Sequence, residues 1–169
     1  MFVDSHCHLT FEGLAGRINA VREAMRQAHV DRALVICTTL EEFDAVHALA
    51  TSHEEFWCSA GVHPDNEGVR EPGVEDLVAL ASRPRVVAIG ETGLDYYYDH
   101  SPRDVQQQVF AAQIQLAHER RLPLVIHTRD AWDDTFDVLA AEGVPEQTIF
   151  HCFTGGPAEA ERCLAVGAF

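Results

Sequence analysis

The chain contains no lysine, and all 12 of its basic residues are arginine. A lysine amine is required for Schiff-base catalysis and for the phosphate loop of Walker-type nucleotide-binding proteins, so both chemistries are excluded for this chain. No apolar run is long enough to cross a bilayer, and no basic segment precedes an apolar stretch as in a signal peptide. We therefore expect a cytoplasmic protein without a membrane partner.

Paired cysteine motifs are also missing. The five cysteines are an odd number and include no Cys-x-x-Cys pair. Three of them, Cys7, Cys37 and Cys58, fall in apolar segments that we predict to be strands. This pattern indicates reduced thiols in a cytosolic protein and not a disulfide framework.

Positive charge is scarce, because 12 basic residues face 27 acidic ones and give a net charge of −15. This balance argues against a broad basic surface that grips duplex DNA without sequence preference. It leaves open a compact site that holds a single phosphate on metal ions.

Short apolar, β-rich segments alternate with longer helical ones. The predicted strands are residues 2–8, 33–37, 56–61, 86–90, 124–126 and 148–150. Alternation of this kind is typical of βα units and a parallel sheet. In the helix predicted to end at Arg121, the helical period places four apolar residues on the buried face, namely Val105, Val109, Ala112 and Leu116.

Six βα units in a row, without Gly-x-Gly-x-x-Gly after the first strand, favour a TIM-type (β/α)8 barrel over a Rossmann sheet. A complete barrel typically has ~250 residues and at least ~200. We therefore expect one domain over residues 1–169 that holds the first six βα units, with strands 7 and 8 missing.

Polar side chains recur at the carboxyl ends of these strands. Five of the six predicted strands carry such a residue, and the set is His6, His8, His63, Glu91, His127 and His151. One histidine after a strand is usually a core residue, but the strand ends of a parallel barrel meet on one face, where active sites of this fold lie. Because residues i and i+2 of a strand share a face, Asp4, His6 and His8 should project together.

This many histidines and one carboxylate exceed what one metal ion needs. They suit two divalent ions that share a bridge, and Glu91 is the natural bridge because a carboxylate can ligate with each oxygen. The expected cofactors are two ions of Zn, Mn or Mg, and imidazole ligands favour Zn, Mn, Co or Ni over Mg. Asp4 either fixes a histidine tautomer or braces the first strand.

In several motifs the chain resembles a known family, the TatD-type metal-dependent deoxyribonucleases of the amidohydrolase superfamily. The motifs that carry the resemblance are Asp4–Leu9, Gly61–Pro64, Gly90–Tyr97, Pro123–Ala131 and His151–Gly155. They occur in the family's order and span the whole chain. The resemblance implies a TIM barrel that hydrolyses DNA, often as an exonuclease. Because a net charge of −15 offers little counterion release along a duplex, we expect single strands or ends as substrate. We expect the full-length protein to be a monomer.

The resemblance also implies residue roles. One metal would take His6, His8 and Glu91, and the other would take Glu91, His127 and His151. His63 and Arg129 would face the substrate phosphate, and with Glu91 they form the expected catalytic set. Arg129 lies two residues past His127, which favours the same role.

The aromatic run that begins at Tyr96 could have either of two roles. Tyr96 and its neighbours could stack on a nucleobase or sugar, or they could pack the loop over the barrel rim.

Two departures from the family pattern stand out. The chain has Asp65 where the family commonly has the second histidine of His-Pro-His, and no residue matches the Asp that the family takes from strand 8. Two alternatives remain open. One is a sibling hydrolase acting on an ester or amide of a small molecule or aminoacyl-tRNA, and the other is an inactive metal-binding fragment.

Overall fold

The chain folds into a curved sheet of six parallel strands in sequence order. The computed structural model describes residues 1–65 and 72–169. The strands are β1 (Phe2–Cys7), β2 (Val30–Val35), β3 (Phe56–Ala60), β4 (Val86–Asp95), β5 (Leu124–Arg129) and β6 (Thr148–Phe150). Each pairs in parallel with its sequence neighbour. The predicted succession of βα units is confirmed, and the strands form part of a TIM-type barrel.

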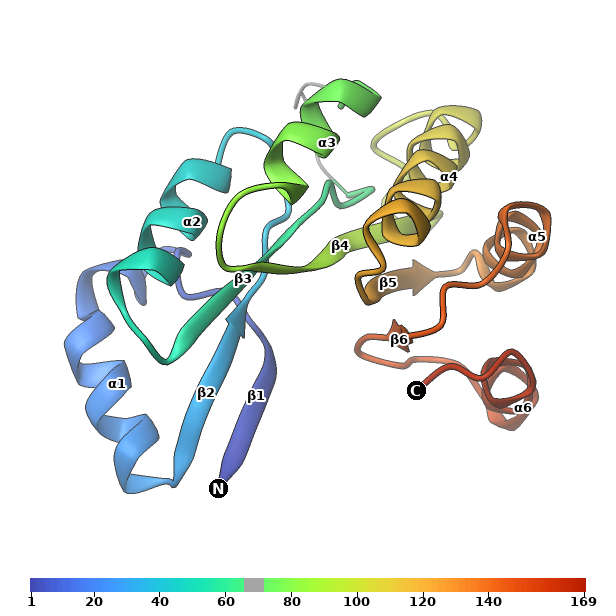
Figure 1. Cartoon of the computed structure of the whole chain (residues 1–169). Helices are drawn as coiled ribbons and strands as arrows, with labels where there is room; N and C mark the ends of the chain where they lie inside the picture. Colours follow the sequence, from blue (N-terminus) through green and yellow to red (C-terminus); the bar gives the residue numbers. More distant parts are fainter. Residues whose placement is uncertain (66–71) are drawn as a thin grey trace.

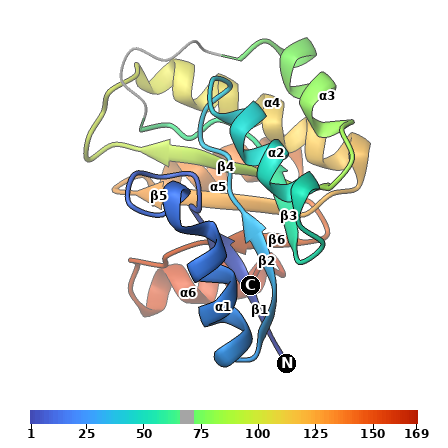
Figure 2. The same cartoon turned by 90° about the vertical axis from the view of Figure 1, so that its left-hand side faces the viewer.

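Helices cover the outer side of this sheet (Figure 1). They are α1 (Ile18–Gln27), α2 (Phe43–Ser52), α3 (Val74–Ala81), α4 (Arg103–Arg120), α5 (Trp132–Glu142) and α6 (Pro157–Ala165), and a short 3-10 turn (Ala15–Arg17) precedes α1. Seen from the side of α1 and α2, these two helices lie in front of the first strands (Figure 2). Within residues 1–65 and 72–169, no helix has the length and apolarity to span a membrane.

The core lies between helices and sheet in two clusters. One joins β2, β3 and α2 through side chains such as Val35, Phe43 and Phe56. The other joins β4, β5, α4 and α5 and includes Phe110 and Ile126. Burial of these apolar surfaces is the main force that holds the helices against the strands. All five cysteines are free, and burial raises the pKa of the Cys7, Cys37 and Cys58 thiols to about 12.

The buried face of α4 differs from the predicted one. Val105, Val109 and Ala112 are only partly buried, whereas Gln106 and Gln113 are 3% and 0% exposed. Leu116 is buried as predicted. The prediction failed because it ranked positions by apolarity. The two glutamines are buried because their amides satisfy backbone groups near strand ends, which an apolar side chain cannot do.

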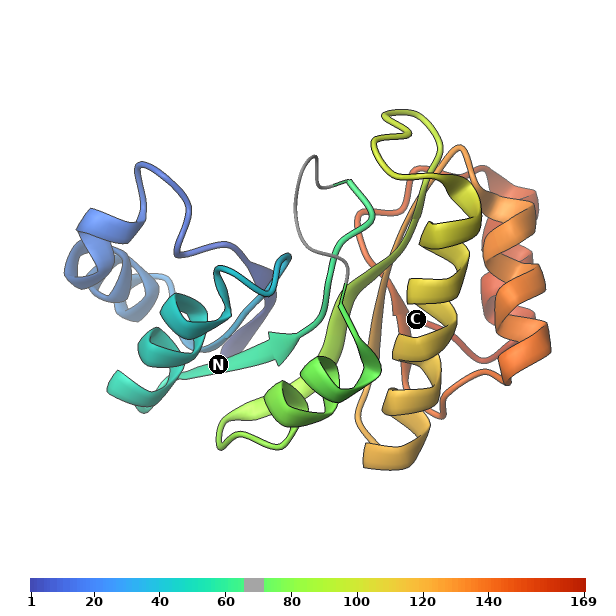
Figure 3. The same cartoon turned by 90° about the horizontal axis from the view of Figure 1, so that it is seen from above.

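The sheet has two edges, β1 and β6, at the two ends of an open arc (Figure 1). Seen from above, α1 and α2 lie at one end of the molecule and α5 and α6 at the other (Figure 3). Phe2 and Val3 on β1 are 66% and 63% exposed. At the other edge, the Phe150 N–H donates to the Phe169 carbonyl at 3.0 Å, and the Phe169 N–H donates to the Thr148 carbonyl at 2.9 Å. The backbone of Phe169 therefore hydrogen-bonds with β6 at the edge where a (β/α)8 barrel places its seventh strand.

Candidate metal centre

Strand β4 carries the central carboxylate of the site. The predicted strand ended at Gly90, but β4 runs on to Asp95. Glu91 therefore lies within the sheet and is only 4% exposed. A side chain held on a buried strand has few alternative positions, so its two oxygens can be aimed in fixed directions.

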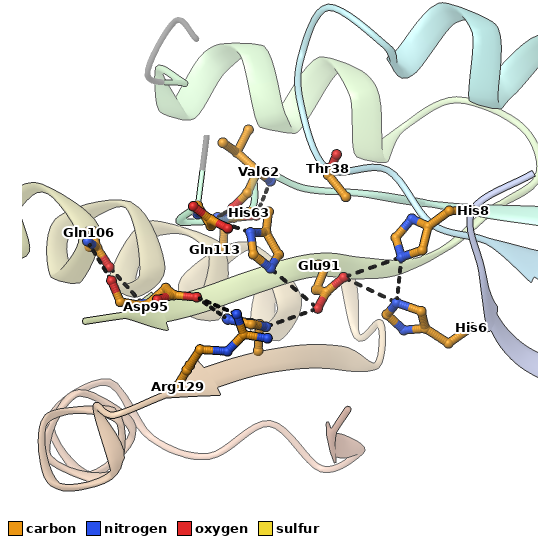
Figure 4. Close-up of polar contacts among 12 residues, drawn as sticks. His6, His8, Thr38, Val62, His63, Glu91, Asp95, Gln106, Gln113 and Arg129 are labelled. Atoms are coloured by element: carbon orange, nitrogen blue, oxygen red, sulfur yellow. Dashed lines mark hydrogen bonds and ion pairs between the residues drawn. The ribbon is translucent and has the colours of Figure 1, made fainter. Parts of the chain in front are cut away.

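Each oxygen of Glu91 faces its own pair of imidazoles (Figure 4). Oε2 lies 3.2 Å from His6 Nε2 and 3.9 Å from His8 Nε2. Oε1 lies 3.5 Å from His127 Nδ1 and 3.6 Å from His63 Nε2. In each group of three the donor atoms lie within 4.8 Å of one another. The arrangement gives two convergent donor sets that share one carboxylate.

The donor chemistry of the first set fits a divalent cation. The Nε2 atoms of His6 and His8 are 3.2 Å apart and both face Glu91 Oε2. Their buried Nδ1 atoms have no hydrogen-bond partner among the described residues. Imidazole nitrogens that converge with a carboxylate oxygen are ligands for Zn or Mn. The side chains present therefore fit a metal ion.

The electrostatics favour an ionised Glu91. Burial raises the pKa of this carboxyl, but hydrogen bonds with His127 and His6 outweigh burial and hold the pKa below its usual range. Burial and the neighbouring His6 lower the imidazole pKa of both His8 and His151. An ionised carboxylate and neutral imidazoles are the protonation states that bind metal ions.

Each ring nitrogen of His127 faces a carboxylate. Burial lowers the pKa of His127, but hydrogen bonds to Glu91 and Asp95 raise it above the ordinary value. Its Nε2 lies 2.9 Å from Asp95 Oδ2, and its Nδ1 faces Glu91. Gly93 pairs with His127 across β4 and β5. At φ +134° a Cβ on Gly93 would clash with the His127 carbonyl oxygen, so this close approach of the strands requires glycine.

His63 has a different hydrogen-bonding arrangement. Its Nδ1 accepts the Asp65 backbone N–H at 3.0 Å, so a neutral His63 carries its proton on Nε2. Burial, despite the nearby Glu91 charge, lowers the His63 pKa to about 4. The Nε2–H group is thus a hydrogen-bond donor facing Glu91. The Asp65 carboxylate, which departs from the family pattern, is paired with His100 Nδ1 at 2.6 Å.

The remaining expected ligand, His151, lies beside the first donor set. Its ring is stacked on His6, with centroids 3.3 Å apart. It lines a cavity of about 350 Å³ together with Glu91, His63 and His127. The group within ligand distance of Glu91 Oε1 contains His63 in place of His151. The role of His151 as a ligand stays a prediction.

Arg129 and Tyr96 are placed differently. Arg129 lines the same cavity, and its guanidinium lies 5.9 and 5.2 Å from the ring centroids of Tyr97 and Tyr98. The Tyr96 hydroxyl instead donates to Asp134 Oδ2 at 2.6 Å, and Tyr96 is not among the described residues that line the cavity. Its position matches the rim-packing reading, and the exposed aromatic faces near Arg129 are those of Tyr97 and Tyr98.

Sequence reasoning missed Asp95 as a site residue. The predicted strand ended at Gly90, five residues earlier, so Asp95 was not expected beside Glu91. Glu91, Gly93 and Asp95 alternate with the period of a strand, and extending the strand would have placed Asp95 on the face of Glu91. Asp4 is at the periphery, where its Oδ1 accepts the His6 backbone N–H at 3.1 Å and braces the strand.

Comparison with known proteins places this site in a family context. Residues 3–169 match the family model described as TatD related DNase. The chain is 38% identical over 172 residues to the uncharacterized metal-dependent hydrolase YcfH of Escherichia coli K12, covering 99% of this chain and 64% of that protein. It is 38% identical over 147 residues to the 3'-5' ssDNA/RNA exonuclease TatD of Klebsiella pneumoniae, covering 85% of this chain and 56% of that protein.

A solved structure of a TatD homolog resembles this chain in fold. The crystal structure of YjjV, a TatD homolog from Escherichia coli K12, superposes with a TM-score of 0.91 at 32% identity, covering 99% of this chain and 66% of that one. The chain thus spans about two thirds of the length of such relatives. The family model, the relatives and the fold all agree: this chain belongs to the TatD-related DNase family.

Proposed function

We propose that the protein is a metal-dependent phosphodiesterase that hydrolyses DNA at ends or in single strands with a dinuclear divalent-metal site. The observation that carries the proposal is Glu91, whose two oxygens each face a separate pair of imidazoles. One carboxylate between two donor sets is the arrangement expected for a bridging ligand. The proposal includes a cytoplasmic location and a monomeric full-length protein.

The ligand assignment combines the two oxygens of Glu91 with the family resemblance, which adds His151 to the second ion although the His151 ring stacks on His6. His6, His8 and Oε2 would hold one ion, and His127, His151 and Oε1 would hold the other. When bound, the ions would orient the phosphate and neutralise negative charge that develops on its oxygens. His63 is better suited to the substrate, because its proton lies on Nε2 while Asp65 occupies Nδ1.

Arg129 extends the donor surface on the far side of Glu91. Arg129 lines the cavity, and its guanidinium can donate two N–H groups to one phosphate, which gives both charge and orientation. Tyr97 and Tyr98 lie next to it, 64% and 47% exposed. Their ring faces could stack on an unpaired nucleobase.

Single strands and ends suit this surface better than the interior of a duplex. With a net charge of −15, the chain offers little counterion release along a duplex, so binding must depend on the cavity and its rim. The name of the Klebsiella pneumoniae relative, a 3'-5' ssDNA/RNA exonuclease, supports a single-stranded substrate.

The test measures hydrolysis by the full-length protein, loaded with Mn or Zn, on three substrates: a labelled single-stranded oligonucleotide, a covalently closed duplex circle and a carbonyl ester. We expect rapid cleavage of the oligonucleotide and little of the other two. Glu91→Gln should abolish the activity, and Glu23→Gln on α1 is the matched control for loss of one carboxylate. Cleavage of the ester alone would favour a carbonyl hydrolase. Failure of the full-length protein to bind metal would contradict the proposal and indicate an inactive protein.

A further inference from the structure

We propose that Asp95 is a positioning residue that sets the tautomer of His127 and so aims the His127 Nδ1 lone pair at the metal site. This inference rests on the proposed function in one respect, namely that a metal ion binds at His127. It concerns one buried carboxylate that is absent from the expected ligand sets. Asp95 is 1% exposed, so every contact of its side chain is with protein atoms or the cavity.

The Asp95 carboxylate is locked in orientation by backbone donors. Oδ1 accepts the Tyr97 N–H at 3.0 Å and the Tyr98 N–H at 2.9 Å. The residue's own backbone is fixed by Gln106, whose Oε1 accepts the Asp95 N–H at 2.9 Å and whose Nε2 donates to the Asp95 carbonyl at 3.2 Å. With Oδ1 committed to two donors, only Oδ2 is directed toward β5.

Asp95 Oδ2 lies 2.9 Å from His127 Nε2, within hydrogen-bond distance. An ionised carboxylate can only accept a hydrogen bond, so a neutral His127 must carry its proton on Nε2. Its Nδ1 then has a lone pair, and this atom is the one that faces Glu91 Oε1 at 3.5 Å. A carboxylate that holds the far nitrogen of a metal-binding histidine in this way orients the ring and raises its basicity.

The competing explanation is that Asp95 serves only as an ion-pair partner of Arg129. That contact is longer, because Arg129 Nη1 lies 3.9 Å from Oδ2, and the Arg129 side chain is 37% exposed. A partly exposed pair at this distance contributes little. The geometry therefore assigns the His127 contact as the main role of Oδ2.

Asp95→Asn distinguishes positioning from plain structural support. The asparagine oxygen should stay on the Tyr97 and Tyr98 N–H groups, which places its NH₂ group opposite His127 Nε2. Nε2 must then accept, and the proton moves to Nδ1, where it blocks the atom that faces Glu91. Asp95→Ala removes the constraint and leaves both tautomers accessible. Asp134→Asn, on the same rim but bonded to Tyr96, is the matched control.

The experiment records ring-nitrogen chemical shifts of His127 in the metal-free chain, at a pH where the ring is neutral, and then metal affinity by competition with a chelator. We expect Nε2–H in the parent chain and in Asp134→Asn, Nδ1–H in Asp95→Asn, and a mixture in Asp95→Ala. Affinity for Zn at the His127 site should fall by ~10–100-fold in Asp95→Asn, and Asp95→Ala should be affected less.

Two results would overturn the proposal. One is an Nε2–H tautomer of His127 that persists in folded Asp95→Asn. The other is a larger loss of Zn affinity in Asp95→Ala than in Asp95→Asn, as expected if Asp95 only supports the loop. Circular dichroism confirms folding of each variant. If the parent chain binds no Zn, the proposed function fails, whereas the shifts of the metal-free chain still decide the role of Asp95.

Discussion

The ring of His151 lies parallel to the ring of His6, at an interplanar angle of 5° and a centroid separation of 3.3 Å. His6 belongs to β1 and His151 follows β6, so the stack joins the two edge strands of the sheet. The curvature of the sheet thus brings its two edges together at the carboxyl ends of the strands, where the donor groups lie.

This contact allows the ligand role of His151 to be tested apart from its packing role. His151→Phe keeps an aromatic ring on His6 but removes both nitrogens, so we expect the metal content to fall by about one ion per chain. His118→Phe, on α4 and away from the cavity, should keep full content. The measurement is the metal-to-protein ratio after dialysis. Full occupancy in His151→Phe would assign the second ion to His63 and His127 instead.

Glu91→Gln should cost more metal than any single His→Ala change in the site. The reason is that, among residues 1–65 and 72–169, Glu91 is the one carboxylate that faces both donor sets, and its negative charge offsets part of the charge of the cations. The amide retains the size of the side chain but loses that charge. The same metal-to-protein ratio checks this, with Glu23→Gln as control. Loss of one ion, with the other retained in full, would show that Glu91 does not bridge.

The metal-free chain should lose stability in acid through His63. Its folded pKa of about 4 lies below the ordinary 6.5, so the folded state favours the neutral ring. The stabilisation is complete above the unfolded pKa and declines as the pH falls from about 6.5 to about 4. At about 1.4 kcal/mol per pKa unit, the decline is at most about 3.5 kcal/mol. Urea unfolding across this range should show a smaller decline for His63→Gln, and equal slopes would contradict the assignment.

The outer edge of β1 should promote self-association of the chain. Phe2 and Val3 are exposed on a strand whose described partner, β2, lies on one side only, and such edges pair with other chains. Val3→Lys places a charge on this edge and should shift the chain toward monomer in analytical ultracentrifugation. Leu164→Lys removes an even more exposed apolar residue from α6 and should leave association unchanged. Identical behaviour of the two variants would exclude the edge as the cause.

Much of this architecture could be predicted from the local pattern of apolar and polar residues in the sequence. The alternation of apolar strands and amphipathic helices predicted the parallel sheet, and side-chain alternation on a strand placed His6 and His8 together. Because the carboxyl ends of parallel strands meet, Glu91, His63 and His127 could be assigned to one site without knowing any distance. These inferences depend only on backbone periodicity and chain direction, which the order of residues determines.

Other features depended on contacts between distant segments. The buried face of α4 carries Gln106 and Gln113 because β4 and the end of β3 present backbone groups that only an amide can satisfy. The close approach of Gly93 to His127 allows Asp95 to reach Nε2, so the register of β4 and β5 selects which nitrogen faces Glu91. The sequence by itself determined which residues could serve as donors and at which end of the sheet they lie. Only the tertiary structure decided which donor faces which oxygen, because register, hydrogen-bond direction and tautomer arise when the strands pair.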